Sequence, residues 1–219
     1  ENLGSIDGNL FDARGMKLKS VKRKEITDMP LSDGFSLMLD DRIKKHNFYH
    51  KQYPYTVEYT DEQELKNSYA LPFWMPVEDN EYSVQQSRFR VEIPNDQVLR
   101  YKQVNFSNQP DILKSQSIIY TWEINNWKAS QYEPYQPPFK ELVPLVYVGL
   151  ENFSLGSYTG NMSTWQNFGK LQNLLNKGRN ELPESVKQQV GKLLEGVSNT
   201  EDKIEKLYQF LQANTRYVS

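Results

Sequence analysis

Large apolar side chains recur at every second position along most of this chain, from about residue 8 to residue 155. In the stretch SIIYTWEIN, Ile118, Tyr120, Trp122 and Ile124 all fall on one face of an extended backbone. A period of two is that of a β-strand with one buried face. Turn-forming stretches such as DARG, IPNDQ and SNQPD separate the runs. We therefore predict an antiparallel β-sandwich over residues 1–160.

Six further segments show strand character. They are Met16–Val21, Phe35–Leu39, Tyr53–Thr60, Arg88–Ile93, Leu99–Phe106 and Leu145–Leu150. The chain is also rich in aromatic residues, at 13% of its length. Flat rings pack well on a pleated surface, so this composition agrees with a strand-rich protein.

The periodicity changes near the C-terminal end of the sequence. From Ser163 onward, apolar residues recur every three to four positions, which is the period of an amphipathic helix. Ser163 and Gln166 have the spacing of a capping box, and Gly178 is a natural C-cap, so they predict the bounds of a first helix. A second helix is expected from near Pro183 to Gly196.

A third helix is expected to begin at Asn199 or Thr200, either of which can cap it. Its apolar stripe follows the helical spacing and consists of Ile204, Leu207, Tyr208 and Leu211. Tyr217–Ser219 look like the first residues of a strand. The predicted fold is thus mainly β with C-terminal helices: a sandwich followed by three short α-helices in residues 161–219.

The numbers of charged residues and of cysteines argue against several classes of function. With 26 basic and 28 acidic residues, the net charge of −2 gives no strong field to attract nucleic acid. The absence of cysteine excludes disulfides, cysteine-bound zinc and thiol nucleophiles. His46 and His50, in HNFYH, lack the glutamate and third ligand of a zinc-protease motif, so we expect no metal and no cofactor. No run approaches ~18 apolar residues, so we predict no transmembrane segment.

Four aromatic residues stand near expected turns, in LPFWMP and NNWKASQYEPY. They are Trp74, Trp127, Tyr132 and Tyr135. Aromatic side chains on the rim of a sandwich can stack on sugar rings or anchor a protein partner. More often such residues cover the open end of the sandwich, and the sequence leaves both interpretations open.

Several stretches, in this order and spacing, resemble a known family. YPYTVEYT, FWMPVEDNEYSVQQSRFRVEIP, YTWEINNWKASQYEPYQPP and LVPLVYVG resemble the N-terminal domain of a bacterial family common in Bacteroidetes. In that family, a β-rich domain of unknown function precedes a transglutaminase-like, papain-related core. The closing stretch TEDKIEKLYQFLQANTRYVS is similar to the first helix and strand entry of that core. The resemblance covers nearly the whole chain.

The resemblance implies a scaffold without the reactive part. In the family, a helix carrying a catalytic cysteine follows the position of Ser219, with a histidine and an aspartate further on. A thiolate needs a base and a group that orients the base. Because this chain has no cysteine, the catalytic residues map onto no position in it. We expect a fragment shortened at both ends that is not itself an enzyme, with residues 161–219 as the helical lead-in to an absent core.

The expected function is that of a non-catalytic accessory domain that packs on the transglutaminase-like core and positions it. The expected packing residues are Ile204, Leu207, Tyr208, Leu211 and Tyr217. By resemblance, the protein is expected outside the cytoplasm, either periplasmic or secreted. The alternative function is a glycan- or peptide-binding module that uses the rim aromatics. An uncovered edge strand would also allow association with a second copy.

Overall fold

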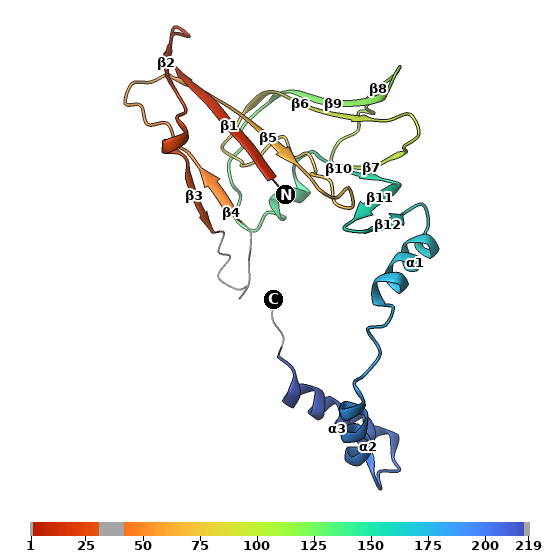
Figure 1. The fold of residues 1–219 in the computed structure, drawn as a ribbon. Helices are drawn as coiled ribbons and strands as arrows, with labels where there is room; N and C mark the ends of the chain where they lie inside the picture. Colours follow the sequence, from red (N-terminus) through yellow and green to blue (C-terminus); the bar gives the residue numbers. More distant parts are fainter. Residues whose placement is uncertain (1, 31–41, 217–219) are drawn as a thin grey trace. The chain divides into compact units, whose positions relative to one another are not determined.

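The computed structural model describes residues 2–30 and 42–216. The expected strand Phe35–Leu39 and the expected strand start Tyr217–Ser219 lie outside the described residues. The chain is mostly β, in several antiparallel sheets, with three helices toward its C-terminus (Figure 1), which confirms the predicted fold class. The chain divides into two compact units. The first consists of Glu1–Glu64 and Gly178–Ser219, and the second is Leu65–Lys177. The predicted domain boundary near residue 160 stays a prediction.

The β part of the first unit is a three-stranded antiparallel sheet. In it, β1 (Asn2–Phe11) lies between β2 (Lys17–Ser20) and β5 (Thr56–Glu64). A short helical turn, η1 (Arg23–Glu25), follows β2. Among the described residues, this part also contains the antiparallel pair of β3 (Thr27–Pro30) and β4 (Arg42–Lys45).

The connection between β1 and β2 is a tight turn with a clear sequence origin. The Asp12 carboxylate accepts hydrogen bonds from the backbone N–H groups of Arg14 at 2.9 Å and Met16 at 2.8 Å. Gly15 has a φ of 76°, a left-handed conformation that glycine adopts without steric cost. The DARG signal is thereby confirmed as a turn.

The second unit contains one three-stranded sheet and two strand pairs. The sheet has the order β6 (Val84–Ile93), β9 (Ile118–Trp127) and β8 (Asp111–Lys114). The first pair joins β7 (Leu99–Val104) to β10 (Leu145–Leu150), and the second is the hairpin of β11 (Asn152–Leu155) and β12 (Tyr158–Asn161). All of these pairings are antiparallel.

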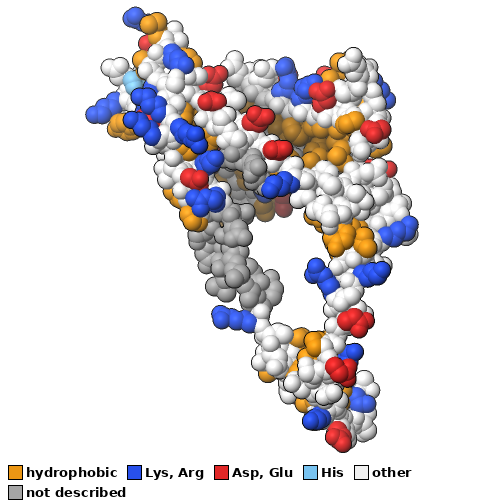
Figure 2. Space-filling view, in the orientation of Figure 1, with side chains coloured by type: hydrophobic (Ala, Val, Ile, Leu, Met, Phe, Trp, Pro, Cys, Tyr) orange, Lys and Arg blue, Asp and Glu red, His pale blue; other side chains and the backbone are white. Residues whose placement is uncertain are grey.

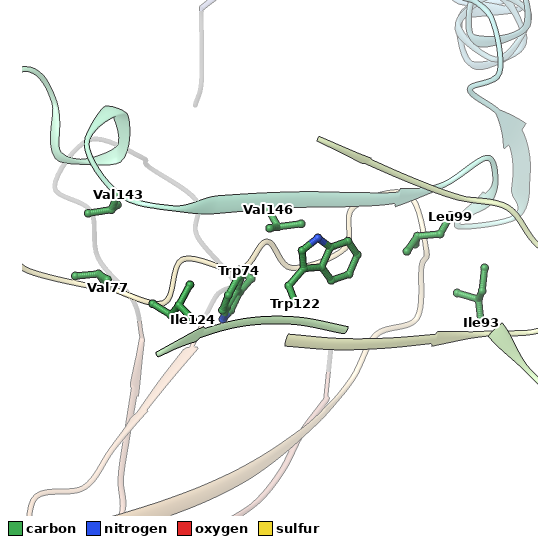
Figure 3. Close-up of a cluster of buried hydrophobic side chains, with 8 residues drawn as sticks. All are labelled: Trp74, Val77, Ile93, Leu99, Trp122, Ile124, Val143 and Val146. Atoms are coloured by element: carbon green, nitrogen blue, oxygen red, sulfur yellow. The ribbon is translucent and has the colours of Figure 1, made fainter. Parts of the chain in front are cut away.

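The core of the second unit lies between the β6–β9–β8 sheet and the β7–β10 pair (Figure 3). Trp122 of β9 is 1% exposed and Val146 of β10 is fully buried. The Trp122 indole N–H donates to Gln103 Oε1 of β7 at 3.2 Å, so the one polar atom of this ring is paired across the two layers. This packing of two strand layers on an apolar interior is what the alternating pattern predicted.

Helix α1 (Trp165–Asn176) packs on β12 and belongs to the second unit. Its cap is Thr164, whose hydroxyl accepts from the Asn167 N–H at 3.1 Å, so the prediction of Ser163 as the cap is wrong by one residue. The reason is local, because the Ser163 hydroxyl donates instead to the side chain of Asn161. Leu171 is the buried residue of this helix.

Helices α2 (Glu184–Leu194) and α3 (Thr200–Asn214) contact each other. Asn199 caps α3 through a hydrogen bond from the Glu201 N–H, which decides between the two predicted caps. Gly178 and Gly196, with φ of 77° and 73°, follow the ends of α1 and α2, as their C-cap signals predicted. Among the described residues, no helix has a stretch apolar and long enough to cross a bilayer.

Candidate functional site

A cavity of about 490 Å³ lies beside the proline-rich connection between β9 and β10 in the second unit. Its walls come from the segment before β6, the end of β9, and residues 130–143, which include the helical turn η2 (Phe139–Glu141). Val77 and Val143 line the cavity, are only 1% and 2% exposed, and lie together at one end of the core in Figure 3. The cavity is therefore built directly on the close-packed interior, which resists deformation.

Hydrogen bonds between distant segments hold the cavity walls. The Ser130 N–H donates to the Asn80 carbonyl at 2.8 Å, which ties the segment before β6 to the segment after β9. The Asn105 side chain donates to the Glu141 carbonyl at 2.6 Å and so ties η2 to the end of β7. These contacts fix two of the connections that form the cavity.

The rim of the cavity contains a turn with an unusual residue. The Gln136 N–H donates to the Glu133 carbonyl at 3.1 Å, with Pro134 second in the turn and Tyr135 third. Tyr135 has a φ of 66°, as the third residue of a type II turn requires. Glycine or asparagine usually takes that place, because a left-handed conformation costs other residues about 1–2 kcal/mol. The turn thus holds a large ring where glycine would be less strained.

Two of the four predicted rim aromatics line this cavity. Trp127, the last residue of β9, and Tyr135 both line it, and the Tyr135 side chain is fully exposed at 101%. The Trp127 indole N–H makes no hydrogen bond to any described residue. A half-buried indole donor of this kind is available to a bound molecule.

The other two predicted residues lie elsewhere. Tyr132 is 68% exposed in the same connection but does not line the cavity. Trp74 was expected on the rim, yet it is only 8% exposed and belongs to the core. Its indole N–H donates to Ser87 Oγ at 3.0 Å, and its backbone pairs with Val146 at 2.9 Å in both directions. These long-range contacts bury Trp74, so its predicted exposure is not found.

The polar side chains of the cavity were not predicted. Asn80, Ser130, Gln131, Glu133 and Gln136 all line it. Each is an ordinary loop residue without a motif, so the sequence holds no signal that separates them from other loop residues. In the part of the chain that the structure describes, no lysine or arginine lines the cavity, and Glu133 is its one charged side chain. The cavity therefore offers amide and hydroxyl groups but no cation to an anionic ligand.

Helix α3 presents a second candidate surface. The predicted stripe residues Ile204, Leu207, Tyr208 and Leu211 are exposed by 62%, 37%, 60% and 53%. Hydrophobic side chains are accordingly visible on the surface of the α2–α3 pair in Figure 2. Tyr217, the fifth predicted packing residue, lies outside the described residues. The stripe is apolar and available for contact with another surface.

The two histidines lie in the segment after β4 and have different partners. His46 is close to Tyr59, with Nδ1 2.8 Å from the hydroxyl, and its Nε2 lies 3.8 Å from Glu25 Oε2. The His50 ring instead contacts Tyr55, with centroids 5.8 Å apart. No group of three or more residues suited to metal binding occurs in the part of the chain that the structure describes.

Glu25 of η1 is held as a carboxylate beside this histidine segment. Desolvation acts to raise its pKa, but the ion pair with Lys19 at 3.3 Å and the nearby Lys22 outweigh it, so the pKa is lowered. The arrangement joins η1, β2 and the segment after β4, and it has the character of a structural ion pair.

Comparison with known families identifies the chain. Residues 1–131 match the model of a family described as a domain of unknown function with a solved structure, DUF3857. The chain belongs to the DUF3857 family. The matched segment of the DUF3857 domain includes all strands from β1 to β9, together with Trp127 and Ser130. The Tyr135 turn follows the matched segment.

One solved structure has a similar fold. It is the 2.00 Å crystal structure of a "putative protease" from Parabacteroides distasonis ATCC 8503, with 12% sequence identity and a TM-score of 0.61. The similarity covers 96% of this chain but 40% of that one, so this DUF3857 chain spans less than half of its structural neighbour. At such low identity the likeness concerns the fold alone. No curated protein matches the sequence.

Proposed function

We propose that this chain is a non-catalytic accessory part of a larger protein, and that α3 is the surface on which another domain packs. The observation that carries the proposal is the exposed stripe Ile204, Leu207, Tyr208 and Leu211. Burying a leucine-sized side chain stabilises a contact by about 1.5–3 kcal/mol, so a stripe of four is a strong site for association. The proposed occupant is the transglutaminase-like core that the sequence resemblance implies.

Two further observations support this role. The structural neighbour is longer than this chain and bears a protease name, which agrees with a catalytic part elsewhere in such a protein. This chain has no cysteine, so it cannot supply the nucleophile of a cysteine–histidine–aspartate triad. We propose accordingly that the chain positions the core and takes no chemical step itself. A location outside the cytoplasm is part of the same proposal.

The test compares the 219-residue chain with the full-length gene product. Leu211→Asp places a charge in the stripe, and Ala213→Asp places the same charge on the opposite side of α3 as a matched control. Leu211→Asp is expected to lower the stability of the full-length protein by about 2–3 kcal/mol, because a buried leucine is lost there. In the 219-residue chain, where Leu211 is 53% exposed, it should have little effect. Equal effects in both proteins would refute the proposal.

A second candidate function is a binding module for a glycan or a peptide. The observation that favours it is that Trp127 and Tyr135, from separate segments, line one cavity of about 490 Å³. This volume lies within the range of ~300–1,000 Å³ that is usual for ligand sites. Titration of wild-type and Trp127→Ala chains with oligosaccharides and peptides tests it, because binding to this cavity must weaken in the variant.

A further inference from the structure

We propose that the cavity lined by Trp127 and Tyr135 binds a neutral saccharide. The inference rests on the binding-module function above and assigns a ligand class to the same cavity. Three properties of the cavity carry it: the combination of flat rings with amide groups, the absence of a cation, and the strained turn that presents Tyr135. The first two each disfavour a different class of ligand, and the third points to the Tyr135 turn as part of a binding site.

The first property is the pairing of apolar rings with uncharged polar groups. A pyranose has an apolar face of C–H groups and a periphery of hydroxyls, each of which both donates and accepts hydrogen bonds. Trp127, Phe139 and Tyr135 supply the rings. The amides of Asn80, Gln131 and Gln136 each offer donors and an acceptor, as a hydroxyl periphery requires. A groove for an apolar or proline-rich peptide has fewer such groups.

Several of these polar groups are free to bind. The Gln136 Oε1 accepts from the Glu133 N–H at 3.1 Å, while the amide nitrogen of Gln136 donates to no described residue. Neither the Gln131 side chain nor the Trp127 indole N–H bonds to another described residue. The Ser130 N–H and the Asn105 side chain both donate to backbone carbonyls of the cavity walls, so little of this arrangement has to be ordered on binding.

The second property is the charge of the lining. Among the described residues that line the cavity, Glu133 is the one ionisable side chain apart from the Tyr135 phenol, and none is a lysine or arginine. A uronic acid or a phosphorylated sugar would bring its negative charge next to the Glu133 carboxylate without a compensating cation, which is unfavourable. A neutral sugar meets no such penalty, and its hydroxyls can donate to that carboxylate. The electrostatics therefore disfavour anionic saccharides.

The third property is the strain at Tyr135. Glycine at this position would remove a cost of about 1–2 kcal/mol, yet the turn carries a tyrosine that is 101% exposed and gains nothing from burial. Strained conformations of this kind concentrate at binding sites. Tyr135 lines the same cavity as Trp127, so its exposed ring is available to a sugar held against Trp127.

The test is a calorimetric titration of the 219-residue chain with three kinds of probe: maltohexaose and cellohexaose as neutral sugars, trigalacturonic acid as an acidic one, and a proline-rich peptide. At least one neutral sugar should bind, and about tenfold more tightly than trigalacturonic acid. Trp127→Ala and Tyr135→Asn should each weaken that binding about tenfold, which corresponds to about 1.4 kcal/mol. Tyr132→Ala, in the same connection but outside the cavity, is the control and should leave the affinity unchanged.

The outcomes separate the ligand class from the general function. If the peptide binds in a Trp127-dependent manner and no sugar does, the saccharide assignment is wrong and the binding module stands. If no probe binds at millimolar concentration, the saccharide assignment and the binding-module function are both wrong. Equal affinity for the acidic sugar would overturn the electrostatic argument. Tyr135→Gly separates an effect on binding from an effect on folding. This variant should preserve or raise Tm while it weakens binding. A lower Tm would show that Tyr135 has a structural role.

Discussion

In the β6–β9 ladder, pairing between neighbouring strands lowers the pKa of a single glutamate. Glu123 lies directly opposite Arg88 in this register. Its carboxylate accepts hydrogen bonds from Asn125 at 2.8 Å, from Arg88 at 2.7 Å and from Gln86 at 3.1 Å. These donors favour the ionised form and lower the pKa of Glu123 from 4.5 to about 2.

The lowered pKa predicts a pH dependence of stability. A carboxyl whose pKa is lower in the folded chain contributes stability that is complete above the unfolded value and is lost as pH falls through the folded value. The contribution of Glu123 should therefore disappear between pH 4.5 and about 2. We expect Glu123→Gln to lower Tm at pH 7 and to have a smaller effect at pH 2. Glu78→Gln, at an exposed position, is the control. A difference in Tm between the wild type and Glu123→Gln that is the same at pH 7 and at pH 2 would contradict the prediction.

The four rim aromatics show what a sequence conveys about a site. All four stand near turn signals, yet Trp74 is in the core while Trp127 and Tyr135 share a cavity. The difference arises from the pairing of Trp74 with Val146, 72 positions away, and from the bond between Asn80 and Ser130. The alternating pattern predicts which face of a strand is buried because that property is local. It does not predict which loops meet, because that depends on contacts between distant segments.

At the scale of elements, α1 is fixed to the β11–β12 hairpin by a close approach at Gly160. A Cβ at Gly160 would lie 2.8 Å from the Leu171 side chain and would also collide with the Phe153 ring. Both neighbours are buried, at 4% each, so neither has room to move. The packing of α1 on the hairpin thus depends on Gly160, a glycine that no helix or strand pattern in the sequence explains.

Gly160→Ala is expected to lower the free energy of unfolding by about 1–3 kcal/mol, the usual cost of inserting a methyl group into a packed core. The matched control is Gly169→Ala in α1, where a Cβ meets no atom within 4 Å. That change should raise stability by about 0.5–1 kcal/mol, since alanine is the better helix former. Denaturant unfolding measures both, and the same sign for the two variants would contradict this description of the α1 packing.

Strand β5 is the element that bears on the predicted self-association. Among the described strands it forms one edge of its sheet, and all nine of its residues are exposed. An edge of this length can pair with a second copy. It also carries Glu58, Asp61, Glu62 and Glu64, which would face like charges in such a pair.

We therefore expect the charges of β5 to oppose self-association. Neutralising Asp61 and Glu62 together, to Asn and Gln, should shift the sedimentation profile toward dimers at a given concentration. Neutralising Glu78 and Glu81, which lie outside β5, controls for the change in net charge. If both pairs of substitutions have the same effect, or neither has any, β5 is not the interface.

At the scale of the whole molecule, the buried apolar residues are distributed very unevenly between the two units. Of the twelve buried hydrophobic residues among those described, Leu10 lies in the first unit and the other eleven lie in the second. The alternating pattern is equally clear in both, so the sequence predicted strands in each without showing this difference. Periodicity marks the face that a strand can bury, whereas the extent of burial depends on how many layers pack against it.

The uneven core predicts that the two units open at different free energies. Regions with few buried contacts exchange their amide hydrogens through local opening, while core strands exchange only through global unfolding. In native-state hydrogen exchange, the amides of β6, β7, β9 and β10 should be the most protected, and those of β1 and β5 should exchange faster. Val146→Ala should lower protection throughout the second unit, because Val146 is fully buried there, whereas Leu10→Ala should affect the first unit. Equal protection of β1 and β9 would mean that the two units unfold as one.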